Sequence, residues 1–97
     1  MTFESSLKPT AYDYNDQGRI TAARHCDRLR EFMESLEGVS GERAVQIARM
    51  YLHENQTGLA TYAGLSRSRL SELKRKAKPT QADKNALISA FVRRWLA

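Results

Sequence analysis

The sequence predicts an all-α fold, a compact multi-helix domain in which apolar residues recur at helical spacing. They follow one another at intervals of three and four in "DQGRITAARHCDRLREFMESLEG", in "SGERAVQIARMYLHEN" and again near the C-terminus. Almost nothing alternates in the way that predicts a strand. A length of 97 residues suits one domain. Residues 1–15 lack a sustained period, so we expect them to form a flexible N-terminal arm.

The first two predicted helices each have one apolar face. In the first, which we expect to end at Gly38, the face consists of Ala22, Cys26, Leu29, Met33 and Leu36. Cys26 is interpreted there as a small core residue. In the second, Ser40 is the expected N-cap and the inward residues are Ala44, Ile47, Ala48, Tyr51 and Leu52.

The positive charge is confined to the C-terminal part of the chain. Residues 1–55 carry seven Lys/Arg and nine Asp/Glu, whereas residues 56–97 carry nine and two, and the net charge is +5. A local excess of this kind favours a basic face for a polyanion. The sequence has no apolar run of membrane-spanning length, the pattern of a signal peptide is missing, and the lone Cys26 has no partner for a disulfide. A cytoplasmic protein is therefore expected.

Residues 56–75, "QTGLATYAGLSRSRLSELKR", have the spacing of a helix-turn-helix. A small residue is needed where two helices cross, a glycine where the turn requires a positive φ, and a hydroxyl where the second helix begins. The residues that meet these demands or point inward are Leu59, Ala60, Ala63, Gly64, Leu65, Ser66, Leu70 and Leu73. The alternative is two ordinary helices joined by a glycine turn.

In a helix-turn-helix the second helix lies in the major groove of DNA, with its N-terminal residues nearest the bases. Arg67 is the first candidate for reading a base, because its planar group can donate two hydrogen bonds to guanine. The other outward candidates are Ser68, Ser71, Glu72 and Arg75. Glu72 alternatively forms an ion pair with Arg69 or Arg75. The candidates for phosphate contacts are Thr57, Ser66, Arg69, Lys74, Lys76 and Lys78.

The last predicted helix follows a capping box at Thr80 to Asp83. It carries a broad apolar face made of Leu87, Ile88, Phe91, Val92, Trp95 and Leu96. We expect residues 16–78 to form the helical DNA-binding domain, and residues 79–97 to pair with a second subunit. The alternative is that the whole face folds back on the chain's own first helices.

The stretch "LEGVSGERAVQIARMYLHENQTGLATYAGLSRSRLSELKRK" resembles the small plasmid-encoded repressors of the TrfB/KorA kind, and "AFVRRWLA" matches them weakly. The resemblance implies a homodimer that binds a palindromic operator, represses plasmid promoters and reads bases with Arg67. Two features depart from the family. Its longer, partly β connection to the dimerisation region is replaced by "AKPTQADK", and its usual glutamine is replaced by Glu72.

The sequence offers no support for an enzyme. His25 and His53 lack metal-ligand spacing, and no nucleophile with a base or phosphate-binding loop can be proposed. The expected partners are therefore double-stranded DNA and a second copy of the chain, with no metal, cofactor, membrane or small-molecule ligand. The rival hypothesis is a plasmid- or phage-encoded antitoxin or inhibitor that covers a protein partner with residues 1–15, including Phe3, Tyr12 and Tyr14.

Overall fold

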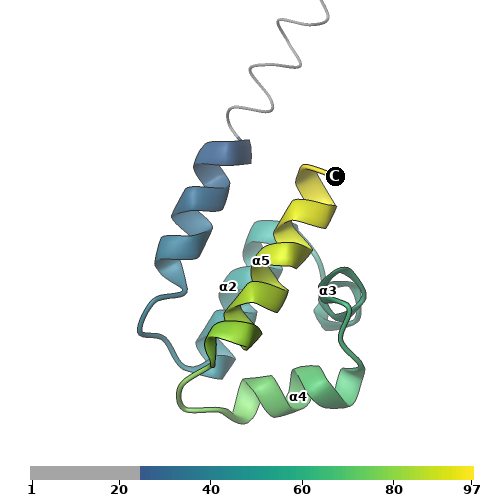
Figure 1. Ribbon diagram of the computed structural model, residues 1–97. Helices are drawn as coiled ribbons and strands as arrows, with labels where there is room; N and C mark the ends of the chain where they lie inside the picture. Colours follow the sequence, from purple (N-terminus) through teal and green to yellow (C-terminus); the bar gives the residue numbers. More distant parts are fainter. Residues whose placement is uncertain (1–24) are drawn as a thin grey trace, which may run out of the picture.

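The computed structural model describes residues 25–97, and all regular structure within this range is helical (Figure 1). A first helical segment covers residues 25–35, and it is followed by α2 (Gly41–Leu52), α3 (Gln56–Ala63), α4 (Arg67–Arg75) and α5 (Gln81–Trp95). The expected all-α class is confirmed for these residues. None of their helices combines the length and apolar character needed to cross a membrane. The predicted arm, residues 1–15, lies outside the described residues.

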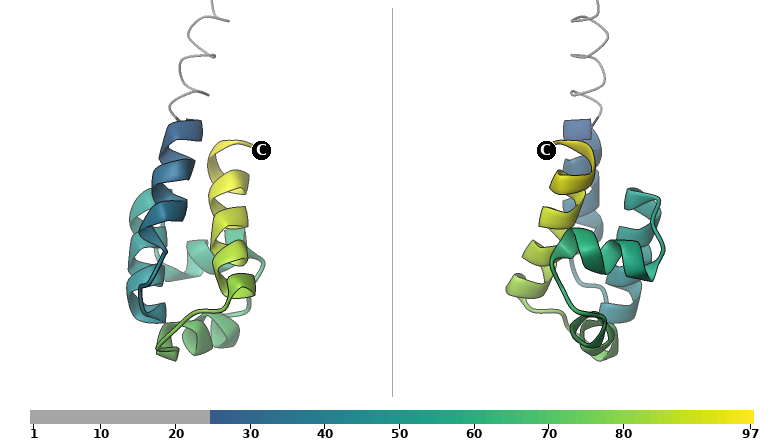
Figure 2. Two further views of the ribbon diagram at one scale, coloured as in Figure 1. Left: turned by 60° about the vertical axis from the view of Figure 1, so that its left-hand side comes forward. Right: turned by 90° about the vertical axis from the view of Figure 1, so that its right-hand side faces the viewer.

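The helices share one hydrophobic core. The first segment and α5 lie side by side and run in opposite directions, while α4 lies across the end of the molecule away from the C-terminus (Figure 2). Each helix contributes fully buried side chains to the same cluster, among them Phe32, Leu52, Leu59, Leu70 and Phe91. Burial of these large apolar side chains supplies most of the favourable free energy of folding.

The predicted helix boundaries are confirmed where local chemistry sets them. Ser40 caps α2 by accepting a hydrogen bond from the backbone N–H of Arg43 at 3.2 Å. Thr80 and Asp83 form the predicted capping box at the start of α5. Gly38, with a φ of 72°, occupies the left-handed region that glycine tolerates best, at the end of the turn of residues 36–38 that follows the first helical segment.

The predicted face of the first segment is wrong at two positions. Cys26 is exposed and Met33 is 43% exposed, whereas Phe32 is fully buried. The ring of Phe32 lies 5.2 Å from that of Tyr51 and 5.5 Å from that of Phe91. Because these contacts place Phe32 in the core, Cys26 and Met33 of the predicted apolar face lie exposed to solvent. Ala22 lies outside the described residues.

Helix α5 belongs to the same core as the preceding helices. Leu87, Ala90 and Phe91 are fully buried within the chain, so this part of the helix completes the chain's own core, and pairing of residues 79–97 with a second subunit stays a prediction. Leu87 and Phe91 cannot contact a second subunit in this arrangement. The other four residues of the predicted dimerisation face remain at least partly accessible: Ile88, Val92, Trp95 and Leu96.

Side chains near the end of α5 hold the C-terminal ends of α2 and α3. Arg93 donates a hydrogen bond to the carbonyl of Tyr62 at 2.7 Å. Arg94 donates to the carbonyl of Leu52 at 3.2 Å, and the indole of Trp95 donates to that of Tyr51 at 3.0 Å. The last carbonyls of a helix have no partner within it, so these contacts satisfy groups that would otherwise need water.

The start of α2 makes a backbone contact with the end of α4. The N–H of Gly41 donates to the carbonyl of Lys76 at 2.8 Å. A Cβ atom at position 41 would overlap the carbonyl oxygen of Leu73, which is backbone and cannot swing aside. Glycine is therefore required here by the close approach of the two helices.

We expect Gly41→Ala to lower the free energy of unfolding by about 2 kcal/mol, because overpacking against backbone forces helix α4 to shift. Gly58→Ala is the matched control. The atoms nearest to its Cβ would belong to the side chain of Glu54, which can move, and alanine favours a helix by about 1 kcal/mol. Urea unfolding measures both changes. Equal stability of the two variants would contradict the backbone contact.

Candidate nucleic-acid interface

Helices α3 and α4 form a tight two-helix unit at one end of the molecule. Gly64 has a φ of 69° in the turn between them, as predicted. The N–H of Leu65 donates to the carbonyl of Ala60 at 3.0 Å, which closes the end of α3. Ser66 then caps α4 by accepting from the N–H of Arg69 at 3.1 Å. The chain therefore turns between the two helices within three residues.

Buried apolar side chains hold this unit against the rest of the molecule. Leu59, Ala60 and Ala63 of α3 are buried, as are Leu70 and Leu73 of α4, and all five were predicted to face inward. Leu65, predicted to fill the angle between the helices, is half-buried and packs against the core. Helix α4 is anchored by only two buried side chains, so most of its surface faces solvent.

The outward side of α4 carries most of the predicted base-reading residues. Arg67, Ser68, Glu72 and Arg75 are exposed. Ser71 is half-buried and lines a shallow hollow together with Glu42, Lys74 and Arg75. Glu42 comes from the first turn of α2, and neither composition nor spacing identified it as a neighbour of this surface.

Glu72 lies near Arg69, but the contact is weak. The Nε of Arg69 is 4.0 Å from Oε1 of Glu72, and both side chains are more than 60% exposed. An exposed pair of this kind contributes between zero and about 1 kcal/mol. Both groups can therefore rearrange when a ligand approaches α4.

Two lysines predicted to contact phosphate are already bonded within the fold. Lys74 is half-buried, and its ammonium donates to Oε1 of Gln56 at 3.2 Å. This contact places a positive charge beside the N-terminus of α3, next to the exposed Thr57. Lys76 donates to a carboxylate oxygen of Asp83 at 2.7 Å. The side chain of Lys76 is still 41% exposed, so its predicted contact with phosphate stays a prediction, in competition with this bond to α5.

Asp83 fixes the connection between α4 and α5. Burial alone would raise the pKa of this carboxyl, but hydrogen bonds from Lys76 and Thr80, with the positive charge of Lys76, outweigh it. The pKa of Asp83 is therefore held below its ordinary value of 3.8. The capping box predicted part of this arrangement, whereas the bond to Lys76 gave no signal in the sequence.

The remaining predicted phosphate contacts lie on the surface. Arg69, Lys78, Thr57 and Ser66 are exposed, and the Ser66 hydroxyl oxygen already accepts the capping bond. Residues 67–78 carry six Lys/Arg and one Glu, so this end of the molecule is strongly basic. Such a surface attracts a polyanion over several ångströms. Among residues 25–97 no group of His, Cys, Asp and Glu is arranged to hold a metal ion.

Comparison with protein-family models, with curated proteins and with solved structures finds no match to this chain. The resemblance to the TrfB/KorA repressors therefore remains an expectation that rests on the sequence stretches quoted above.

We expect Asp83→Asn to lower the free energy of unfolding by about 1 kcal/mol at pH 7, because it removes the ion pair with Lys76 and weakens the capping box. The folded-state pKa of Asp83 lies below 3.8, so its contribution is fully present above that pH. It is lost as the pH falls through the lower folded-state value.

Urea unfolding of the wild type and the variant at pH 7, 5, 4 and 2.5 measures this pH dependence. The difference between the two proteins should shrink towards zero at the lowest pH. Asp27→Asn is the control, because Asp27 is 75% exposed and makes only a 3.5 Å surface pair with Arg30. A difference that is independent of pH would show that the carboxylate charge at position 83 does not stabilise the fold.

Proposed function

We propose that the chain is a sequence-specific transcriptional repressor that acts in the cytoplasm, with α3 and α4 as a helix-turn-helix on double-stranded DNA. The observation that supports this proposal best is the setting of α4. The helix lies across one end of the molecule, two leucines anchor it, and its outward side presents polar and basic side chains. A helix placed in this way can enter the major groove, which is wide enough to admit it.

Arg67 is the principal base-reading residue in this proposal. It is the first residue of α4 and is exposed, so it occupies the helix end that approaches the bases most closely. Ser68 and Arg75 lie on the same outward side and extend the contact along the groove. Glu72 either accepts from a cytosine amino group or orients Arg69, from which it is 4.0 Å away.

Contacts to the DNA backbone would lie on both sides of α4. Thr57 lies at the start of α3, where the ammonium of Lys74 from α4 also reaches, and Arg69 and Lys78 extend from α4 and the loop after it. Contacts from these residues to phosphate groups would fix the register of α4 without reading sequence. This arrangement leaves Lys76 in its bond with Asp83.

A homodimer is part of the proposal because one α4 spans only a few base pairs. Two copies related by a twofold axis would read two half-sites about 34 Å apart. The surface suggested for pairing is the accessible part of α5, Ile88, Val92, Trp95 and Leu96. Repression and a palindromic operator are inferred from the resemblance to the TrfB/KorA family.

The first experiment is a selection of bound duplexes from a random-sequence pool at about 150 mM salt, where non-specific binding is weak. We expect an inverted repeat to be enriched. A pool that yields no motif would contradict the proposal. A protein partner would then be sought, by comparing what the full chain and a chain lacking residues 1–15 bind.

We expect Arg67→Ala to reduce discrimination between the selected duplex and random DNA by about 1–3 kcal/mol, because a bidentate base contact is lost. Lys78→Ala should weaken both duplexes alike and flatten the salt dependence by about one counterion. Arg30→Ala removes another exposed charge, from the first helical segment, and serves as the control. Fluorescence anisotropy at several salt concentrations measures all three.

Equal losses on both duplexes for Arg67→Ala and Lys78→Ala would contradict these two roles. A comparable loss for Arg30→Ala would show that net charge, rather than the surface of α4, determines binding.

We expect Val92→Glu to convert the dimer into a monomer, because a carboxylate would be buried in the paired faces without a partner. Val92 is half-buried at the surface of α5 and is not among the side chains that pack against the core. Met50→Glu, at a site that is 63% exposed on α2, is the control. Analytical ultracentrifugation at micromolar concentration distinguishes the species. A wild type that sediments only as a monomer would rule out this dimer.

A further inference from the structure

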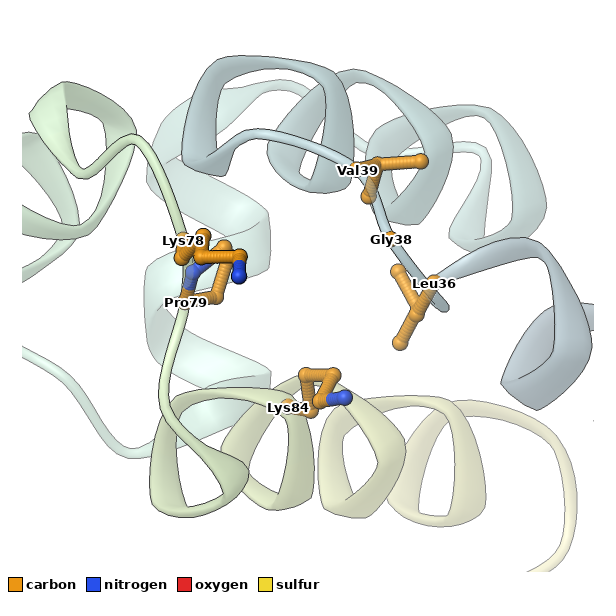
Figure 3. A pocket seen from close by; sticks show the side chains of 6 residues that line it. All are labelled: Leu36, Gly38, Val39, Lys78, Pro79 and Lys84. Carbon is orange, nitrogen blue, oxygen red and sulfur yellow. The ribbon is translucent and has the colours of Figure 1, made fainter.

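A partly enclosed pocket of about 140 Å³ lies between the turn after the first helical segment, the loop before α5 and the start of α5 (Figure 3). Six residues surround it: Leu36, Gly38, Val39, Lys78, Pro79 and Lys84. None of the proposed base-reading residues lines this pocket, although Lys78, a candidate phosphate contact, does.

The pocket combines an apolar wall with two ammonium groups. Leu36 is buried, and Val39 and Pro79 are half-buried. The side chain of Lys84 is only 17% exposed, and its ammonium lies 3.5 Å from a carboxylate oxygen of Glu37, which is itself 72% exposed. A largely buried charge is costly unless it is well paired, and a solvated rim carboxylate pairs with it poorly.

We propose that this pocket binds a small organic anion with a compact apolar body, such as an aromatic carboxylate. The volume supports a body of this size, since a cavity of about 150 Å³ in another protein accommodates benzene. The apolar part would contact Leu36, Val39 and Pro79. The carboxylate would contact Lys84 and Lys78, replacing Glu37 as the partner of the more buried ammonium.

A bound anion would also affect DNA binding, and this consequence rests on the proposed function. Lys78 is a candidate phosphate contact, and an anion in the pocket would draw its ammonium away from DNA. The added negative charge would lie beside the basic segment of residues 67–78. Both effects reduce affinity for a polyanion, so the ligand would act as an inducer that releases the operator.

The test uses benzoate as the probe and the full chain without DNA, so its outcome does not depend on the proposed function. Benzoate is titrated while amide and Lys side-chain resonances are followed by NMR. We expect saturable shifts around residues 36–39 and 78–84. Benzamide, which has the ring without the charge, should bind roughly tenfold more weakly, the factor that about 1.4 kcal/mol of lost attraction produces. Inorganic phosphate, which lacks the ring, should be similarly weak.

Variants separate the pocket from general attraction between anions and lysines. Lys84→Gln and Lys78→Gln should each weaken benzoate binding, and Val39→Phe should block it by filling the pocket while all charges are retained. Glu37→Gln should tighten binding, because the competing carboxylate is removed. Arg49→Gln, on the exposed side of α2, should have no effect. Unfolding curves confirm that each variant is folded. If Lys84→Gln does not fold, Lys78→Gln, at an exposed position, still tests the contact between the carboxylate and a lysine.

Equal binding of benzoate and benzamide, or unchanged benzoate binding by Val39→Phe, would overturn the proposal. Benzoate binding that does not weaken the complex with the selected duplex would retain the site and refute its inducer role. The titrations without DNA decide whether the pocket binds the anion, independently of the result of the duplex selection.

Discussion

The contact of Gly41 with the end of α4 is the constraint on which the exposed surface depends. Helix α4 has only Leu70 and Leu73 to bury, so side-chain packing alone defines its direction weakly. The backbone bond from Gly41 to Lys76 holds its C-terminal end, and the turn at Gly64 holds its N-terminal end. A short helix held at both ends can leave its outward side polar without losing its orientation.

Some of the basic side chains of α4 and its C-cap form hydrogen bonds within the fold, and others are exposed. Lys74 and Lys76 use their ammonium groups to join α4 to α3 and to α5. These bonds stabilise the position of the helix, whereas Arg67 and Arg75 remain exposed for a ligand. The number of cations in residues 67–78 therefore overstates the number that make no bond within the fold.

Features that depend on residues within four positions of one another could be predicted from the sequence. The Ser66 cap, the positive φ of Gly64 and the capping box at Thr80 follow from local steric and hydrogen-bonding demands. The covered side of the first segment could not be predicted, because Cys26 and Met33 continue the same apolar stripe as the buried positions. The bond from Lys74 to Gln56 spans 18 residues, so only the folded chain reveals it.

Only part of the apolar face of α5 is accessible for the homodimer that we propose. Leu87 and Phe91 complete the core, so a pairing surface confined to α5 would be narrow. The first segment lies antiparallel to α5, with Glu37 beside Lys84 at one end, and it leaves Met33 accessible. An interface large enough for the proposed dimer would therefore extend across both helices. Because Met33 is exposed on the first segment, it would add apolar surface to the proposed interface.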